Sequence, residues 1–534
     1  MMDSRDVSGD GDLVLGIDSS TTACKAIVWN LQGEAVAEGR SALPLSMPRP
    51  LWHEQPADAW WTALVSAIRE ALADDEGLSD RVAALCIAPQ RETFVPVDAH
   101  GEPLRPAIVW MDERSREVLP RIAEEYGAER LHRESGKPLS GNLTLSKIAW
   151  LREHEPEVFA KTARYLDVVA FLVEKLTGAY RTGWGCADPT GLFDMQHHRW
   201  NRALLEYLDL NAAQLPEACP PGELLGTLTT ETARICGLPS RLPVIASVGD
   251  GQAGGLGAGV TQSGVAYLNL GTSVVSGTLT ENYVTDRAFR TMYSALPGVY
   301  SLETVLLSGT YIINWFMDDI AAEGETLPDY DAGLEKIPPG AEGLMAVPYW
   351  NSSLTPYWDV DASGIVVGWR GIHTRAHLYR AILEGIAMEQ RLHTQGVETA
   401  LGREVKNYVA MGGGTRSARW CQIIADVTGK DVYRTPSPEA AALGAGIQAA
   451  AGVGLYPSTD AAAKAMSRVV QSPFVPDAAA HEFYTRLYEQ VYRDLFPALQ
   501  GSLKRLAAIT DEATAEQGLQ KDNAHRGGSR ASER

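Results

Sequence analysis

Apolar and polar positions follow two patterns along the chain, one typical of strands and one typical of helices. Short apolar runs at Leu13–Ile17, Lys25–Trp29 and Val82–Ile87 have the length that predicts buried strands. Ala57–Leu72 has the amphipathic spacing of a helix, and Ala376–Ala400 is predicted to form a longer one. Strands that alternate with helices in this way predict an α/β protein.

The remaining elements continue this alternation. Strands are predicted at Ala107–Trp110, Leu242–Val248, Val265–Leu270, Val274–Leu279 and Val409–Met411, and helices around 112–126, 144–176, Thr415–Thr428 and Pro438–Ala451. The last helix consists almost entirely of Ala and Gly, which suits close packing against a neighbouring backbone. Residues 1–11 and 512–534 are polar, and their composition predicts disorder.

The bulk properties narrow the class of protein. A length of 534 residues exceeds one ordinary core and predicts two domains, 12–258 and 259–505. The net charge of −20 argues against nucleic acid or an anionic membrane as a general partner, and no apolar run approaches the ~20 residues of a membrane span. Six sparse cysteines without a Cys-x-x-Cys pair predict a reduced, cytoplasmic protein with no zinc site.

Two short turns stand out, one in each half of the chain. Leu15–Thr22 and Leu268–Val274 each place small hydroxyl residues in a tight turn between strands, where backbone N–H groups can face a polyanion. Between them, Gly249–Gly257 carries a single acid, Asp250, in a glycine-rich stretch. This arrangement predicts two related lobes that grip one nucleotide, and therefore phosphoryl transfer.

Six blocks of the chain share one further pattern: Gly16–Thr22, Gln90–Thr93, Ala107–Arg114, Lys147–Trp150, Gly249–Gly257 and Gly412–Trp420. In these blocks and in their order the chain resembles the FGGY carbohydrate kinases, which include glycerol kinase and xylulokinase. The resemblance extends from about residue 13 to about residue 500 and implies a two-lobe, duplicated ribonuclease-H-like fold, shared with actin, Hsp70 and hexokinase. It also implies a cleft between the lobes that binds ATP, Mg²⁺ and a small sugar. Ser20, Asn142 and Trp369 depart from residue types common in the family, which weakens assignment to one member.

Two carboxylates are the candidates for catalytic chemistry. In the family, the acid that matches Asp250 is the catalytic base for the attacking hydroxyl, and Gly249 and Gly251 are predicted to leave open space beside it. The alternative is that Asp250 caps the helix that follows. Asp18 lies beside the first turn, where a carboxylate is compatible with phosphate through a bound Mg²⁺. Its alternative role is an Asx-turn that stabilises the hairpin.

Nucleotide contacts are predicted from both halves of the chain. The resemblance implies contacts from Ser20, Thr21, Thr22 and Lys25 in the first turn, from Gly271 and Thr272 in the second, and from Gly413 and Gly414 on the adenosine side. Lys25 could equally be a solvated strand charge, and each turn could be a plain turn. Glu384 and Glu439 are interpreted as helix residues and left out of the site.

Sugar recognition is predicted mainly from the first half. The predicted contacts are Gln90, Arg91, Glu92, Trp110, Asp112, Asn142 and Asp250. Adjacent Arg91 and Glu92 offer donors and acceptors to several hydroxyls, unless they form a surface ion pair. Trp110 offers a flat apolar face to sugar C–H groups, unless it packs in the core. Asp112 is expected to accept a hydroxyl or to support Arg91 or Arg114.

The signals for the substrate are divided. Gln90–Thr93 has the glycerol kinase form of its block, whereas Asn142 occupies a position where xylulokinases carry Asn. A ketopentose is therefore the first prediction, with glycerol or another polyol as the alternative. A sugar-binding regulatory pseudokinase is the alternative from another class, although intact Asp18, Asp250 and both turns argue against lost chemistry. The resemblance also allows a homodimer, although no segment carries an interface signature.

Overall fold

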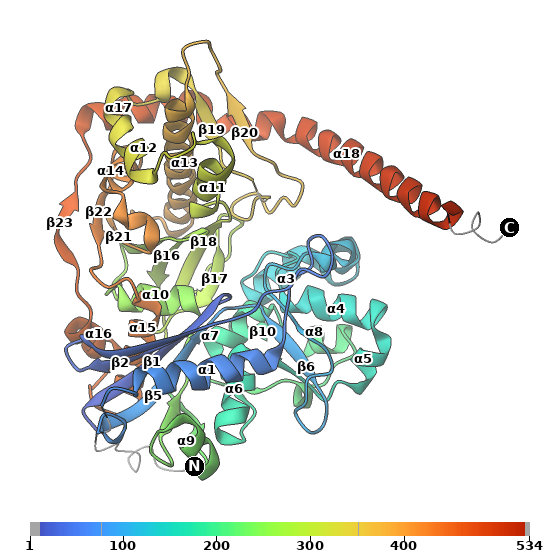
Figure 1. The fold of residues 1–534 in the computed structure, drawn as a ribbon, viewed down its shortest axis with the longest axis vertical. Helices are drawn as coiled ribbons and strands as arrows, with labels where there is room; N and C mark the ends of the chain where they lie inside the picture. The colour runs from blue at the N-terminus through green and yellow to red at the C-terminus, as the bar shows by residue number, and fades with distance from the viewer. Residues whose placement is uncertain (1–10, 76, 351, 529–534) are drawn as a thin grey trace.

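Two lobes face each other in the computed structural model, which describes residues 11–75, 77–350 and 352–528. In Figure 1 the N-terminal half forms the lower lobe, and most of the C-terminal half forms the upper lobe. Each lobe is built on one large sheet, of six strands in the first lobe and seven in the second. The strands of the two predicted halves therefore form two sheets, one in each lobe.

The N-terminal sheet has the strand order β13-β14-β5-β1-β2-β3. Its strands are β1 Leu13–Ser19, β2 Ala23–Asn30, β3 Ala35–Ala42, β5 Val82–Pro89, β13 Leu224–Thr227 and β14 Pro243–Ile245. β1, β2 and β3 form an antiparallel meander, and β5 runs parallel to both β1 and β14. Because β1 and β5 are buried along their whole length, both faces are apolar and the sequence shows continuous hydrophobic runs.

The C-terminal sheet repeats this topology. Its order is β17-β18-β16-β15-β21-β22-β23. The strands are β15 Val265–Leu270, β16 Val274–Thr280, β17 Arg290–Tyr293, β18 Tyr300–Leu306, β21 Asn407–Met411, β22 Asp431–Arg434 and β23 Val470–Phe474. β15, β16 and β18 form the antiparallel part, and β21 and β22 continue it in parallel with β15. The duplication is the one predicted from the two hairpins.

Helices cover both sheets, and the N-terminal lobe adds a small sheet of β4, β6, β7 and β8. The main helices are α1 Ala57–Ala71, α4 Thr144–His154, α6 Val168–Thr177, α9 Thr230–Cys236, α13 Arg375–Leu401, α14 Ala418–Thr428, α16 Thr459–Met466 and α17 Ala478–Leu487. The small sheet holds β4 Glu54–Gln55, β6 Phe94–Val97, β7 Ala107–Ile108 and β8 Arg164–Asp167. No helix in the described part of the chain combines the length and apolarity that a membrane span needs.

One helix from the C-terminal half packs on the N-terminal sheet. α15 (Ala440–Gly452) lies against β1 and β5 on one side and against α10 (Asp250–Gly257) on the other. A Cβ on Gly16 of β1 would lie 2.0 Å from the carbonyl oxygen of Ala442, and a Cβ on Gly444 would lie 1.9 Å from that of Ala253. The Ala/Gly composition of α15 therefore permits backbone-to-backbone contact on two sides, as the sequence predicted.

Three predicted segments differ from the structure. The helix expected at 144–176 is interrupted, because β8 pairs with β6 in the small sheet. The region 112–126 forms a 3₁₀ turn, a short helix with Pro120 in its first turn, and a π turn. At the C-terminus, α18 extends from Arg493 to Gly528, where the composition predicts disorder from 512. Its sequence is rich in Ala, Leu, Lys, Glu and Gln, which favour helix. The predicted disorder at 1–10 and 529–534 lies outside the described residues.

Candidate active site

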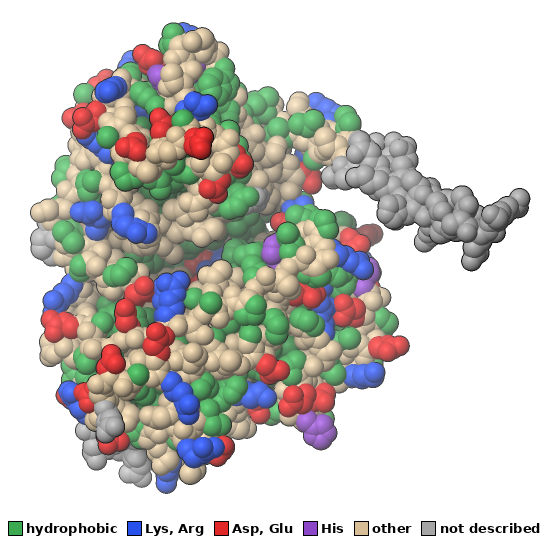
Figure 2. All heavy atoms as spheres, viewed as in Figure 1, with side chains coloured by type: hydrophobic (Ala, Val, Ile, Leu, Met, Phe, Trp, Pro, Cys, Tyr) green, Lys and Arg blue, Asp and Glu red, His purple; other side chains and the backbone are tan. Residues whose placement is uncertain are grey.

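A cavity of about 970 Å³ lies between the lobes, lined by residues of both. In Figure 2 the surface is hollowed at this junction. The N-terminal lobe contributes the β1–β2 turn and the segments that follow β5 and β7, and the C-terminal half contributes the β15–β16 turn and the start of α15. α10 begins at the cavity with Asp250. The two predicted phosphate turns therefore open into the same space.

Both turns present small hydroxyl side chains to the cavity. Ser20, Thr21, Thr22 and Lys25 line it from the first hairpin, and Gly271, Thr272 and Ser273 line it from the second. The side chains of Thr22 and Thr272 are exposed at the tips of their turns. The second turn is held by the N–H of Thr310, which donates to the oxygen of Gly271 at 2.8 Å. A phosphate chain placed between the turns would meet donors from both lobes.

Asp250 is the first residue of α10 and is partly open to the cavity. Its side chain is 39% exposed, and its Oδ1 accepts a hydrogen bond from the N–H of Gly251 at 2.8 Å. Arg91 Nε lies 3.3 Å from the same oxygen. Desolvation raises the pKa of Asp250, and the positive charge of Arg91 opposes this rise. A partly desolvated carboxylate is a stronger proton acceptor than a fully hydrated one, and it keeps a helix-terminal hydrogen bond at the same time.

Asp18, one residue before the end of β1, lies close to this carboxylate and is only 9% exposed. Among the described residues its Oδ1 has no hydrogen-bond partner. Burial, together with the negative charge of Asp250, raises the pKa of Asp18 to about 7, against the opposing charge of Lys25. A buried, unpartnered carboxylate oxygen near a second carboxylate is a situation that a divalent cation relieves. The site therefore fits Mg²⁺, with Asp18 as its candidate ligand.

The raised pKa of Asp18 predicts a pH-dependent stability of the ligand-free protein. Between pH 3.8 and about 7 the folded state holds a proton that the unfolded state releases, so stability falls as the pH rises through this window. Asp18→Asn removes this contribution, which amounts to at most about 4 kcal/mol. Urea unfolding of both proteins at pH 5 and pH 8 should show the variant gaining relative stability at pH 8. A difference between the two proteins that does not change with pH would contradict the assignment.

Lys25 pairs with Glu439, a residue whose sequence pattern indicated only a helix position. Its Nζ lies 2.5 Å from Oε2 of Glu439, and both residues line the cavity. The two residues are 414 positions apart, and Glu439 immediately precedes α15. The ion pair thus joins the β1–β2 hairpin to the C-terminal half beside the phosphate turns. Only the docking of α15 onto the first sheet brings Glu439 here, and no local signal indicated it.

Four predicted sugar contacts line the cavity: Arg91, Trp110, Asn142 and Asp250. The indole Nε1 of Trp110 donates to Thr21 Oγ1 at 2.9 Å, and Asn142 Nδ2 donates to the carbonyl oxygen of Trp110 at 3.1 Å. The ring of Trp110 is thus fixed beside the first phosphate turn, half-buried rather than in the core. The cavity also has walls that were not predicted, including Met111 and Asn269.

Two predicted sugar contacts of the Gln90–Thr93 block are buried away from the cavity wall. Gln90 Nε2 donates to Gln55 at 2.9 Å, and its Oε1 accepts from Thr21 at 3.2 Å, so it supports the first turn from behind. Glu92 binds Arg290 of the other lobe at 2.5 Å. Gln90 and Glu92 therefore have partners inside the protein and do not line the cavity, and their contact with the sugar stays a prediction.

Asp112 likewise has its hydrogen-bond partners inside the protein. It is fully buried and forms a two-pronged ion pair with Arg114, with both contacts at 2.8 Å. It also accepts a hydrogen bond from the N–H of His53 at 2.6 Å. It supports Arg114, as one of the predicted alternatives stated, and it does not line the cavity, so its contact with a sugar hydroxyl stays a prediction.

Two glycines near the predicted site, Gly414 and Gly249, make room for a neighbouring side chain. Neither Gly413 nor Gly414 lines the cavity, whereas Gly412 does. A Cβ on Gly414 would lie 2.3 Å from the ring of Trp420, so this glycine makes room for the indole. Beside Asp250, Arg91 fills the space at Gly249, where a Cβ would lie 2.2 Å from its Cδ, whereas Gly251 lines the cavity as Asp250 does.

Two turns of small hydroxyl residues, one carboxylate at a helix start and a second carboxylate beside the first turn thus border one cavity. The N-terminal domain of the FGGY family of carbohydrate kinases matches residues 13–257, and the C-terminal domain of that family matches residues 266–453. The chain belongs to this family. It is therefore a carbohydrate kinase, a phosphotransferase that acts on an alcohol group, and ATP binding is expected.

Individual FGGY kinases are similar over nearly the whole chain. It is 30% identical to the xylulose kinase of Escherichia coli strain K12, over 91% of this chain and all of that protein. It is 25% identical to the gluconokinase of Bacillus subtilis, over 87% of this chain and 92% of that protein. The crystal structure of xylulose kinase from Rhodospirillum rubrum superposes with a TM-score of 0.85 at 29% identity, covering 92% of this chain and all of that chain. The duplicated two-lobe fold is thereby confirmed.

Proposed function

We propose that this kinase transfers the γ-phosphoryl group of Mg²⁺-ATP to a terminal hydroxyl of a ketopentose. The observation that carries the choice of substrate is that Asn142 lines the cavity, whereas Gln90 is buried behind it. Asn142 was the residue that indicated a pentulose, and Gln90 belonged to the block that indicated glycerol. The identity of the chain with xylulose kinases supports the same choice.

In the proposed mechanism, Asp250 is the general base. Its carboxylate accepts the proton of the terminal hydroxyl as that oxygen bonds to the γ-phosphorus, the bond from phosphorus to the β–γ bridging oxygen breaks, and ADP leaves. Thr22, Thr272 and the backbone N–H groups of their turns hold the phosphates in line. Mg²⁺, held by Asp18 directly or through water, would supply neutralisation of phosphate charge when bound. Trp110 offers its face to the C–H groups of the sugar.

The test is a comparison of substrates by coupled ADP release, with Mg²⁺-ATP. The panel is D-xylulose, L-xylulose, D- and L-ribulose, glycerol, erythritol, ribitol, xylitol and gluconate. A kcat/KM at least tenfold higher for one ketopentose than for any polyol is expected. Preference for glycerol or another polyol would overturn the substrate proposal and leave the kinase assignment intact. ATP binding without turnover of any sugar would favour a regulatory protein.

Asn142 gives a prediction at the level of one residue. Asn142→Ala is expected to raise the KM for the ketopentose about 2–10-fold, the range for the loss of one neutral hydrogen bond, with a smaller change in the KM for ATP. The steady-state KM of each substrate measures this difference. Asn211→Ala, which removes a surface cap far from the cavity, is the matched control and should leave both constants unchanged. Equal effects of Asn142→Ala on both KM values would contradict the assignment.

The proposal also covers the compartment, the partners and the oligomeric state of the enzyme. The six cysteines are buried and free, which supports a reducing compartment such as the cytoplasm. The net charge of −20 supports partners that are small molecules rather than nucleic acid or anionic membrane. The predicted homodimer remains a prediction that light scattering can test.

A further inference from the structure

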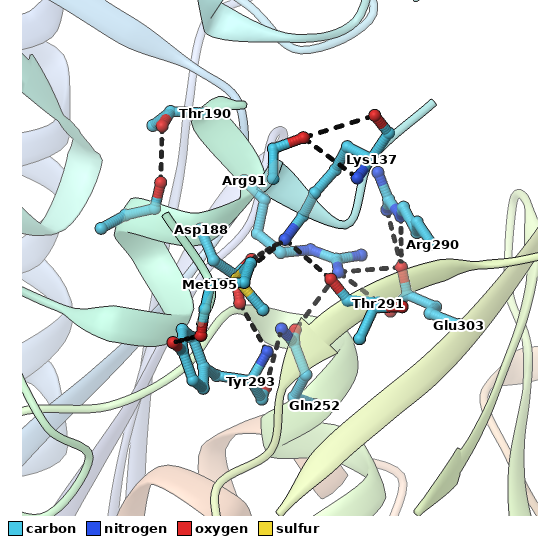
Figure 3. Close-up of polar contacts among 12 residues, drawn as sticks. Arg91, Lys137, Asp188, Thr190, Met195, Gln252, Arg290, Thr291, Tyr293 and Glu303 are labelled. Carbon is cyan, nitrogen blue, oxygen red and sulfur yellow. Dashed lines mark hydrogen bonds and ion pairs between the residues drawn. The ribbon is translucent and has the colours of Figure 1, made fainter. Parts of the chain in front are cut away.

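A chain of alternating charges leads from Asp250 into the contact between the two lobes. Arg91, which lies 3.3 Å from Asp250, also donates through Nη1 to both carboxylate oxygens of Glu303, each at 2.9 Å. Arg290 Nε donates to the same carboxylate at 2.8 Å, and Arg290 Nη1 binds Glu92 at 2.5 Å. In Figure 3 Arg91 and Arg290 are both directed at Glu303. Arg91 and Glu92 belong to the N-terminal lobe, and Glu303 and Arg290 belong to strands β18 and β17 of the other.

The centre of this chain is closed to solvent. The side chain of Glu303 is 0% exposed, that of Arg91 is 7% exposed, and Tyr267 donates its hydroxyl to Glu303 at 3.1 Å. Although burial by itself would raise it, the two arginines hold the pKa of Glu303 at about 2, so the carboxylate stays ionised. A buried arginine that loses its carboxylate partner becomes an uncompensated charge, which costs free energy. The ion pair with Glu303 therefore holds the guanidinium of Arg91 in place.

The strand that carries Arg290 is itself fixed to the N-terminal lobe. Lys137 Nζ donates to the carbonyl oxygen of Thr291 at 2.8 Å, and Asp188 accepts from the N–H of Tyr293 at 2.5 Å. These contacts lie beside the arginines in Figure 3. Glu303 is therefore presented to Arg91 by a strand whose neighbour is pinned across the lobe junction.

On its other side, Arg91 lies across the start of α10. Nη1 of Arg91 also donates to Gln252 Oε1 at 3.2 Å, one residue beyond Gly251. A Cβ on Gly251 would lie 2.9 Å from Glu303, so the helix start, the arginine and the glutamate are in close contact. The guanidinium thus has one orientation that satisfies Glu303, Gln252 and Asp250 together.

We propose that Glu303 is a positioning residue for phosphoryl transfer. From the C-terminal lobe it holds the guanidinium of Arg91 against the carboxylate of Asp250, and so fixes the direction in which that carboxylate meets the substrate hydroxyl. This inference rests on the proposed role of Asp250 as the base. A mere structural bridge between the lobes would need the same ion pairs, but its loss would lower stability without a specific loss of turnover.

The test compares Glu303→Gln, Glu303→Asp, Arg91→Ala and the double variant Arg91→Ala/Glu303→Gln. Glu303→Gln is expected to lower kcat about 10–100-fold with the KM for ATP within about twofold, because misplacement of a reacting group acts on turnover. Glu303→Asp, which keeps the charge, should recover part of the loss. If Glu303 acts through Arg91, the double variant should be no slower than Arg91→Ala alone.

The matched control is Glu384→Gln. Glu384 is also a buried glutamate paired with an arginine, at 2.6 Å from Arg380, but it lies in the C-terminal core away from the cavity. It should lose thermal stability as Glu303→Gln does and keep the wild-type kcat. Tyr267→Phe removes one hydrogen bond to Glu303 without changing charge, and it should fold and lower kcat about 2–5-fold.

Each outcome separates this inference from the proposed function. Wild-type kcat in folded Glu303 variants, or additive effects of Glu303→Gln and Arg91→Ala, would overturn the positioning role. If neither Glu303 variant folds, wild-type kcat in Tyr267→Phe would overturn it instead. A loss of kcat in Glu384→Gln equal to that in Glu303→Gln would show that the loss of turnover comes from lower protein stability, and it would overturn the positioning role. Normal turnover in Asp250→Asn would instead remove the base assignment on which the inference rests.

Discussion

Asp250→Asn is expected to slow phosphoryl transfer to the sugar about 10²–10⁴-fold, the usual range for loss of a general base. The amide keeps an oxygen to accept from the N–H of Gly251, so the start of α10 should remain as it is. It cannot take up the proton of the attacking hydroxyl, and it gives Arg91 no charge to pair with. Coupled ADP release measures turnover, and calorimetric titration with ATP measures nucleotide binding, which should be retained.

The control must separate the base from the helix cap, which was the alternative role of Asp250. Asp477 caps α17 in the C-terminal lobe, where its Oδ1 accepts from the N–H of Ala480 at 2.9 Å. Asp477→Asn should change turnover less than twofold, because asparagine caps a helix about as well as aspartate. If Asp250→Asn retains turnover within about tenfold of the wild type, Asp250 supports the start of α10 through its hydrogen bond from the N–H of Gly251 and is not the base.

Gly444→Ala is expected to destabilise the protein by about 2 kcal/mol or more and to lower kcat. Alanine has the higher helix propensity by about 1 kcal/mol, but here its Cβ would meet the carbonyl oxygen of Ala253 at 1.9 Å, and backbone cannot rotate aside as a side chain can. α15 and α10 must therefore separate. α10 begins with Asp250 and α15 follows Glu439, so the shift displaces both cavity groups. Urea unfolding and kcat are the two measurements.

Gly333→Ala is the matched control for this substitution. Gly333 ends the short helix α12 (Leu327–Gly333) with helical backbone angles, and no atom lies within 4 Å of the Cβ it would gain. Its substitution should leave the protein equally stable or up to about 1 kcal/mol more stable, with unchanged kcat. Equal stability of Gly444→Ala and Gly333→Ala would contradict the close contact between α15 and α10.

The sequence alone determined the parts of this protein that depend on a few neighbouring residues. A buried strand, a tight turn of small hydroxyl residues and an acid at the start of a glycine-rich helix each have a local pattern. Because these patterns are local, the sequence was sufficient to place Asp18, Thr22, Thr272 and Asp250 in one predicted site, and all four line the cavity. Their contacts with phosphate stay a prediction. The duplicated fold followed from the resemblance and from two hairpins in matching order.

Only the tertiary structure decided which polar side chains face the cavity and which are buried and bonded to other groups of the protein. Gln90 and Glu92 follow strands in the way binding residues do, but their partners come from other elements and have no local signal. Asp112 instead pairs with Arg114, two residues further on, which the sequence did offer as a partner. Arg91 and Glu303 form an ion pair although they are 212 positions apart in the sequence, and Lys25 and Glu439 form one although they are 414 positions apart. The physical reason is that a buried charge must find an opposite charge, and the packing of distant strands and helices determines where that charge lies.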